Sequence, residues 1–338
     1  MAGAVAQLEI LAPDLLPALV RHGLPAARTV ATLLARADFT ELPWPGLERA
    51  LLQACAMPWH GAASPPLAAA SARLDLGAPA AAGVTLRADP VHLRADPARL
   101  VLFDAATLDL TAAEADGLIE HLNAHFAADG LTLARGPSPQ RWYLAWPQAL
   151  QVPSASPRSL RGVPLEPDQA TRQGLGELRR LLTEMQMVLH DCDTNRARTT
   201  AGKPPVNSVW PWGWGELPVP GAGAPAVLFG RDGEADVVAA HLGARHEADP
   251  LRLDAVLGAA AGKVVGVITA RDERGADTHW YEVLEAAAAA LAGGRVVRLV
   301  VHTEHGRFVL ARAAWRRWWR RPAPFVQRWQ ARLAEEAG

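Results

Sequence analysis

Histidine and carboxylate side chains gather where two apolar runs of the sequence end. One run covers residues 295–304, and the other covers residues 260–270. Imidazole and carboxylate groups are ligands for divalent cations, and parallel strands end at one edge of their sheet. Asp272, His279, Glu304 and His305 are therefore the candidate ligands of a divalent metal, Mn²⁺ or Zn²⁺. The favoured interpretation of these residues is a pair of solvated polar loops.

The stretch 204–218, PPVNSVWPWGWGELP, contains three of the 12 tryptophans of the chain. Read alone, it is a candidate aromatic platform for a ligand. The alternative is that Trp210 and Trp212 fill a junction between an inserted subdomain and the main sheet, since indoles bury a large area and glycines allow close backbone approach. We favour the structural role for these two residues. Asn207 and Trp214 are the candidate ligand-facing residues of the loop.

The segment 312–322, RAAWRRWWRRP, combines arginines with the helically spaced Trp315, Trp318 and Trp319. Such a face suits phosphates and stacked bases, which makes nucleic-acid binding an alternative function. The favoured interpretation is a terminal helix that packs its tryptophans on the body of the protein and leaves its arginines in solvent.

Two types of organisation are expected along the chain. Residues 1–75 predict short helices, and residues 64–83 have the composition of a linker. The segment 111–130 predicts a helix, because Thr111 is followed three residues later by Glu114, as in a capping box. Short strands are expected around that helix, at 98–105, 131–136 and 141–146.

The second half of the chain alternates strands with helices, which is typical of a largely parallel sheet flanked by helices. The apolar stripe in residues 168–192 gives the strongest helix prediction in the chain. Further helices are expected at 235–243 and 280–294, and strands at 224–230, 260–270, 295–304 and 306–313. Two glycine-rich segments, 221–226 and 258–265, do not have the spacing and following helix of a nucleotide-binding loop.

The composition is that of a globular protein. The 338 residues are 50% hydrophobic and 20% charged, with a net charge of −1, which argues against a dedicated nucleic-acid or membrane-surface protein. The two cysteines, Cys55 and Cys192, fit a reducing compartment. The N-terminus has no signal-peptide pattern, and no apolar run reaches the about 20 residues of a membrane helix. We expect a cytoplasmic protein with no membrane partner.

Four stretches together resemble cofactor-independent phosphoglycerate mutases of the archaeal type, which belong to the alkaline phosphatase superfamily. They are ADPVHLRADPARLVLFD, LTAAEADGLIEHLN, GPSPQRWYLAW and HDCDTNRARTTAGKPPVNSVWPWGWG. The resemblance spans residues 84–306, is most specific in the tryptophan loop, and looks closest to a proteobacterial branch of RpfE-type regulatory proteins.

This resemblance implies an alkaline-phosphatase-like α/β fold with an inserted α+β subdomain. The implied domains are a divergent helical N-terminal region with a linker (1–83), the subdomain (84–150) and the phosphoglycerate-mutase-like domain with a basic C-terminal helix (151–338). Arg141 occupies the position of a family arginine in the substrate-binding insertion. Glu304 replaces the aspartate of a metal-binding Asp-His-Gly motif, and His279 is displaced from an Asp-x-x-Gly-His motif that retains Asp272.

One departure from the family is decisive for the expected chemistry. The family begins with a metal-binding Asp-Gly pair and a Ser or Thr nucleophile, and residues 1–75 contain neither pattern. Phosphoryl transfer between two metals needs both the clamp and the activated hydroxyl. The preferred hypothesis is a catalytically degenerate regulatory or binding protein whose partner is a phosphorylated or anionic small molecule, or another protein. The alternative is an active metal-dependent phosphatase or mutase with a rearranged site.

Overall fold

The computed structural model describes residues 4–24, 27–61, 64–77, 84–96, 99–146, 155–160, 176–260, 262–269 and 279–337. The chain forms two compact units. Unit 1 consists of Met1–Trp59 and Pro218–Gly338, and unit 2 consists of His60–Leu217. The expected boundaries at residues 83 and 150 differ from this division, because the N-terminal region belongs to the same unit as the C-terminal third of the chain.

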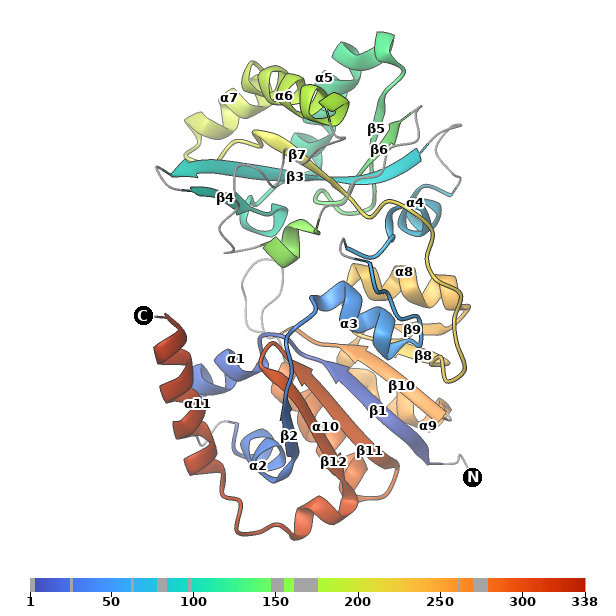
Figure 1. The fold of residues 1–338 in the computed structure, drawn as a ribbon, viewed down its shortest axis with the longest axis vertical. Coiled ribbons are helices and arrows are strands. Elements are labelled where there is room, and N and C mark those ends of the chain that lie inside the picture. The colour runs from blue at the N-terminus through green and yellow to red at the C-terminus, as the bar shows by residue number, and fades with distance from the viewer. Residues whose placement is uncertain are drawn as a thin grey trace. The chain divides into compact units, whose positions relative to one another are not determined.

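Unit 1 is built on a seven-stranded sheet with the order β2-β12-β11-β1-β10-β8-β9 (Figure 1). Four of its strand pairs are parallel, and the β11–β12 and β12–β2 pairs are antiparallel. This confirms the predicted mixed α/β class with a largely parallel sheet. The strands are β1 (Val5–Leu11), β2 (Asp38–Glu41), β8 (Val227–Phe229), β9 (Arg245–Glu247), β10 (Gly262–Val267), β11 (Val296–Thr303) and β12 (Gly306–Ala311).

The central strand of this sheet is β1, which the sequence-based prediction of short helices in residues 1–75 did not include. Its sequence VAQLEIL places Gln7 and Glu9 on one face, and Leu8 and Ile10 on the other, which is the period-two pattern of a strand. Leu8 and Ile10 belong to the main apolar core of the unit, together with residues from five helices. These helices are α1 (Leu15–His22), α2 (Arg28–Arg36), α9 (Leu253–Ala259), α10 (Trp280–Ala292) and α11 (Pro322–Ala337).

Two other helices of unit 1 contact each other, α3 (Leu47–Ala54) and α8 (Gly233–Leu242), and α3 also packs on β1. The C-terminal segment is not the single helix expected from its spacing. Residues Arg312–Arg316 form a short 3₁₀ helix, η5, and α11 begins only at Pro322, because proline is favoured in the first turn of a helix. None of the described helices combines the length and the apolar character that a membrane span requires.

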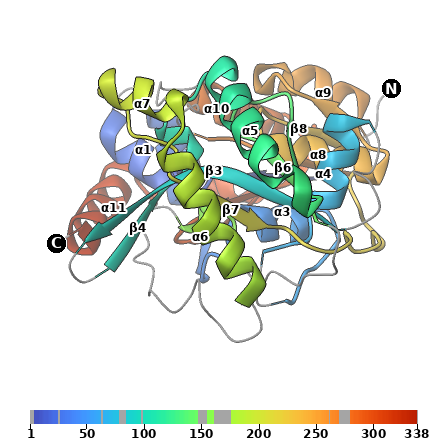
Figure 2. The ribbon, with the colours of Figure 1, turned by 90° about the horizontal axis from the view of Figure 1, so that it is seen from above.

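Unit 2 is built on an antiparallel sheet with the order β4-β3-β6-β5, and β7 pairs with β3. Its strands are β3 (Val84–Asp96), β4 (Arg99–Phe103), β5 (Thr132–Arg135), β6 (Trp142–Trp146) and β7 (Ser208–Trp212). Figure 2 shows α5 and α6 lying across this sheet. Its helices are α4 (Ala68–Leu76), α5 (Ala112–Phe126), α6 (Gly176–His190) and α7 (Asp193–Thr200).

The local expectations for unit 2 are largely confirmed. The helix α5 begins with the predicted capping box, in which Thr111 Oγ1 accepts a hydrogen bond from Glu114 N and Glu114 binds back to Thr111 N. The predicted linker at 64–83 is wrong in its first half, which contains α4. The tryptophan loop contains the strand β7, which tolerates Pro211 because β3 is its one partner strand among the described residues.

Candidate functional site

The tryptophan loop is tied to a buried ion pair on β3. The Nε and Nη2 atoms of Arg87 donate to Asp89 Oδ1 at 3.0 and 2.8 Å, and Trp212 Nε1 donates to Asp89 Oδ2 at 2.7 Å. The Arg87 guanidinium also lies 5.0 Å from the centroid of the Trp212 ring. All three side chains are buried. A buried ion pair needs such additional partners, so this geometry supports the structural role expected for Trp212.

Arg141 belongs to a second polar group of unit 2. Its Nη1 atom donates to both carboxylate oxygens of Asp75, at 3.1 and 3.0 Å. The Tyr143 hydroxyl donates to Asp75 Oδ2 and is hydrogen-bonded to Ser71 Oγ, each at 2.5 Å. Burial raises the pKa of Tyr143, and the hydrogen bond to Asp75 adds to this effect. The ion pair joins the residue before β6 to α4, and a role of Arg141 in ligand binding stays a prediction.

The other two ligand candidates of the loop lie in different surroundings. The Asn207 side chain forms two hydrogen bonds with the backbone of Leu93, in which Nδ2 donates to the carbonyl oxygen at 2.8 Å and Oδ1 accepts from the amide at 2.7 Å. These bonds fasten the start of β7 to β3. Trp214 is half-buried and packs against the core of unit 2. The surroundings of Asn207 and Trp214 neither support nor contradict ligand binding, so this role stays a prediction for both residues.

In the described part of the structure, the candidate metal ligands do not lie close together. Asp272 lies outside the described residues, and His279 is exposed with its Nδ1 atom 2.9 Å from Glu282. His305 Nε2 lies 2.9 Å from Glu336 Oε2. Within the described residues, no group of three or more His, Cys, Asp or Glu side chains is arranged to hold a metal ion. The metal site stays a prediction that depends on Asp272.

Glu304 and His305 do line one open groove of unit 1. Its volume is about 510 Å³, and its lining residues are Glu41, Leu42, Pro43, Glu304, His305, Arg332 and Glu336. The His305 ring packs edge-to-face on Trp329 of α11, with the ring centroids 5.2 Å apart. Arg332 Nη2 donates to Glu41 Oε1 at 2.7 Å and Arg332 Nε donates to Glu336 Oε1 at 3.0 Å, so Arg332 engages two of the carboxylates of the groove.

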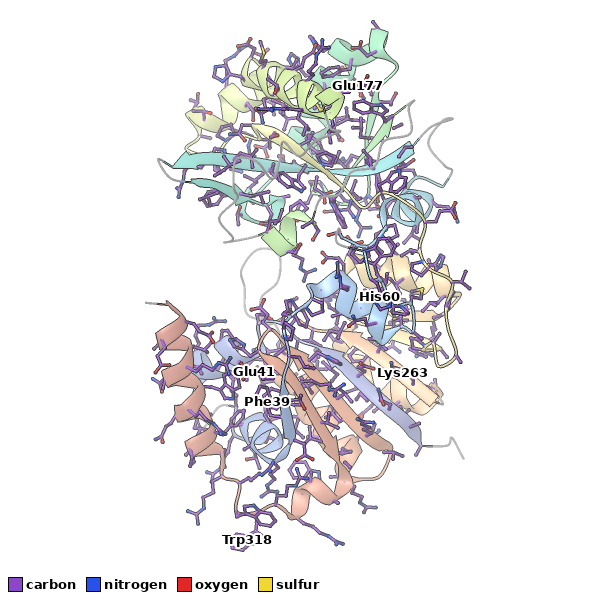
Figure 3. The ribbon with its side chains drawn as sticks, viewed as in Figure 1. Phe39, Glu41, His60, Glu177, Lys263 and Trp318 are labelled. Carbon is purple, nitrogen blue, oxygen red and sulfur yellow. The ribbon has the colours of Figure 1, made fainter. Side chains whose placement is uncertain are left out.

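A charged cluster at the centre of unit 1 was missed by the sequence-based prediction. Glu9 of β1 lies between two basic side chains of the neighbouring strands, with Oε1 2.7 Å from His302 Nε2 and Oε2 2.6 Å from Lys263 Nζ. Gln7 Nε2 donates to the same carboxylate at 3.0 Å. Figure 3 shows Lys263 on β10, beside β1. A glutamate in the middle of a short apolar strand is the sequence signal that could have identified this cluster.

The electrostatics of this cluster stabilise the ionised carboxylate. Burial alone would raise the pKa of Glu9, but hydrogen bonds and charges from His302 and Lys263 outweigh it and lower the pKa to about 2. At Cys55, directly after α3, burial raises the pKa of the thiol to about 12, so the thiol is protonated. Glu9 is therefore an anion held between partners, and not a group poised to exchange protons near neutral pH.

A third basic side chain extends the cluster along the same face of the sheet. Arg307 of β12 lies directly opposite His302 of β11, and side chains opposite each other in an antiparallel pair share a face. The Nε atom of Arg307 is buried and has no hydrogen-bond partner among the described residues. We refer to Glu9, Lys263, His302 and Arg307 as the β1 cluster. It contains one carboxylate and three basic side chains.

The comparisons with known proteins point to phosphoglycerate mutases. No protein-family model matches the chain. Over 154 residues, the chain is 29% identical to the probable 2,3-bisphosphoglycerate-independent phosphoglycerate mutase of Geobacter sulfurreducens, and the match covers 45% of this chain and 38% of that protein. The chain thus spans about two fifths of the length of this curated relative, and it is weakly homologous to it.

Two solved structures are similar to 91% of this chain. One is the PH0037 protein from Pyrococcus horikoshii, with a TM-score of 0.47, 12% identity and 88% of that chain covered. The other is a cofactor-independent phosphoglycerate mutase from Thermoplasma acidophilum, with a TM-score of 0.40, 13% identity and 89% of that chain covered.

Proposed function

We propose that this chain is a phosphoglycerate-mutase-like protein that has lost phosphoryl transfer and binds a phosphorylated small molecule in a regulatory role. The first support comes from the residues that follow β1. The family that the chain resembles has an Asp-Gly pair near its N-terminus, whereas β1 ends at Leu11 and continues into Ala12 and Pro13. Neither side chain can ligate a cation, and the first carboxylate after the strand, Asp14, is followed by Leu15 and not by a glycine. A two-metal mechanism needs ligands for both metals.

The proposed binding site is the β1 cluster. Lys263 and Arg307 are always charged near neutral pH, and Glu9 is the single acidic member, so the four side chains carry a net positive charge. Lys263 and His302 have about one fifth of their side-chain surface exposed, 21% and 22%. The observation that carries the proposal is the buried Nε atom of Arg307, which has no partner within the described residues. An unpaired buried donor is costly, and an anionic oxygen would satisfy it.

A phosphate group fits this arrangement better than a neutral ligand does. Guanidinium and ammonium groups form short, charge-assisted hydrogen bonds with phosphate oxygens, and a fixed anion such as Glu9 keeps the cations in place when the site is empty. Phosphoglycerates are the natural first probes, because the curated relative is a probable phosphoglycerate mutase.

The test is a thermal-shift titration with 2- and 3-phosphoglycerate and with inorganic phosphate. A ligand that binds the native state raises the melting temperature progressively with concentration. We expect a shift for the wild type, a much smaller one for Arg307→Ala, and an unchanged one for the matched control Arg231→Ala, which replaces an exposed loop arginine. No shift with any of these anions, or an equal shift in Arg307→Ala, would rule out the proposed site.

A second candidate function, an active metal-dependent phosphatase, is favoured by the groove that contains Glu304 and His305. Residues outside the described set, Asp272 among them, would have to complete the metal site. Metal analysis of the purified protein tests this candidate. A stoichiometric Mn²⁺ or Zn²⁺ ion that is lost in Glu304→Ala would support it, and metal-free protein without phosphatase activity after addition of either ion would exclude it.

A further inference from the structure

Two tryptophans of unit 1 are exposed side by side between η5 and α11. Trp318 is 71% exposed and Trp319 is 61% exposed, and their rings pack edge-to-face with centroids 6.2 Å apart. In Figure 3, the Trp318 side chain projects away from the ribbon. Indoles are large and apolar, and neighbouring exposed ones are unusual on a protein surface that has no partner.

The core of unit 1 does not need these two side chains. Trp315 packs against the core, with the Arg36 guanidinium 5.4 Å from its ring centroid. Trp329 of α11 is buried against Phe39 and Phe308 of the sheet. The tryptophans before and after the exposed pair therefore fasten this region to the sheet, and Trp318 and Trp319 remain available on the outside.

The surroundings of the pair are strongly basic. The sequence between Glu304 and Glu335 contains eight arginines and no acidic residue. One of these arginines, Arg317, is held by both carboxylate oxygens of Asp38, at 2.6 and 2.8 Å. Four exposed arginines of this region contact no carboxylate among the described residues: Arg28, Arg312, Arg316 and Arg321. Positive charge is thus concentrated next to the exposed indoles.

A shallow pocket of about 580 Å³ adjoins this segment. It is lined by Leu24, Arg28, Arg321, Pro322 and Ala323. Two guanidinium groups and three apolar side chains therefore share one hollow. Such a lining fits an anion that is attached to an apolar chain, which is the chemistry of a phospholipid.

We propose that the segment Arg312–Ala323, together with Leu24 and Arg28, binds the surface of a bilayer that contains anionic phospholipids. Trp318 and Trp319 would lie at the level of the headgroups, where indoles are enriched in membrane proteins. The unpaired arginines are attracted to the negative surface potential, and the pocket receives a headgroup phosphate. This inference is independent of the β1 cluster, and it differs from the expectation that the chain has no membrane partner, which stays untested.

A single-stranded nucleic acid fits the same surface less well. Proteins that bind single strands place aromatic rings along a basic groove, so that each ring stacks on a base. Trp318 and Trp319 instead pack against each other at 84°, which leaves no parallel slot between them for a base.

The test is co-sedimentation of the full chain with vesicles of phosphatidylcholine, with and without phosphatidylserine. We expect binding only to the vesicles that contain phosphatidylserine, and weaker binding at higher salt. The double variant Trp318→Ser/Trp319→Ser and the double variant Arg316→Ala/Arg321→Ala should each lower the apparent affinity about tenfold or more. Matched controls replace exposed side chains of unit 2, Met187→Ser and Arg180→Ala, and should bind as the wild type does.

Three results would overturn the proposal. One is a wild type that does not sediment with phosphatidylserine vesicles. Another is binding that is unchanged in both segment variants although their melting temperatures equal that of the wild type. The third is binding to a single-stranded oligonucleotide that requires Trp318 and Trp319 while vesicle binding is absent, because this result would assign the surface to nucleic acid.

Discussion

The carboxylate of Glu9 lies 2.7 Å from Nε2 of His302, although 293 residues separate the two in sequence. The contact joins the central strand β1 to β11, and Lys263 on β10 completes it from the other side. Three neighbouring parallel strands of unit 1 are thereby linked through one buried anion. Stability and ligand binding of this unit should both depend on it.

Replacing Glu9 by alanine should destabilise the protein strongly. The substitution leaves His302 and Lys263 without their carboxylate in a largely buried position, and breaking a buried pair from one side costs about 3 kcal/mol or more. Urea unfolding followed by circular dichroism measures the loss. The matched control is Glu120→Ala, an exposed glutamate of α5, and it should stay within about 0.5 kcal/mol of the wild type. A similar free energy of unfolding for both variants would contradict this account.

The same carboxylate predicts a pH dependence of stability. The pKa of Glu9 falls from its ordinary value of 4.5 in the unfolded chain to about 2 in the folded protein. Its contribution, on the order of 3 kcal/mol, is therefore complete above the unfolded value and is lost as the pH falls toward 2. The free energy of unfolding should drop more steeply between these pH values in the wild type than in Glu9→Gln. Parallel curves for the two proteins would contradict the pairing.

Trp212→Phe should lower the free energy of unfolding by more than the loss of side-chain volume alone would explain. The substitution removes the indole N–H that donates to Asp89 Oδ2, and it leaves this buried oxygen with one donor fewer. We expect a loss of about 1–3 kcal/mol in thermal or urea unfolding. Trp214→Phe is the matched control, since Trp214 is half-buried in the same loop, and it should cost clearly less. Equal losses would show that packing alone explains the effect.

Both thiols should be protected from alkylation in the native protein. Cys55 and Cys192 are buried, and burial raises the pKa of Cys55 to about 12, whereas the thiolate is the reactive form. A thiol-specific reagent at mildly alkaline pH should label neither residue until a denaturant is added. Rapid labelling of Cys55 without denaturant would mean that α3 opens readily from the sheet.

Local sequence signals predicted local structure well. The capping box of Thr111 and Glu114 lies within one turn, and it correctly located the start of α5. The strand β1 was missed because Gln7 and Glu9 interrupt its apolar residues. Glu9 is stabilised in the sheet by His302 of β11 and Lys263 of β10, and Gln7 donates a hydrogen bond to Glu9. These distant partners cannot be identified from the local sequence. The strand β7 was concealed by prolines and glycines, which are the usual marks of a loop.

Contacts between distant residues account for most of what the sequence could not predict about the candidate sites. Arg141 is separated from Asp75 by 66 residues, and no local pattern indicates that the two form an ion pair. The helical spacing of Trp315, Trp318 and Trp319 suggested one buried face, but the backbone leaves the helix after η5 and turns two of these rings outward. Side-chain types identified candidate residues, whereas the pairing of strands decided which of them meet.

The most direct test of the proposed function is a phosphorus NMR spectrum of 3-phosphoglycerate with the protein and Zn²⁺. The account predicts that the phosphate resonance broadens or shifts with wild-type protein and much less with Arg307→Ala, and that no new resonance appears during prolonged incubation. The appearance of 2-phosphoglycerate or of inorganic phosphate, at a rate that scales with protein concentration, would contradict the loss of phosphoryl transfer.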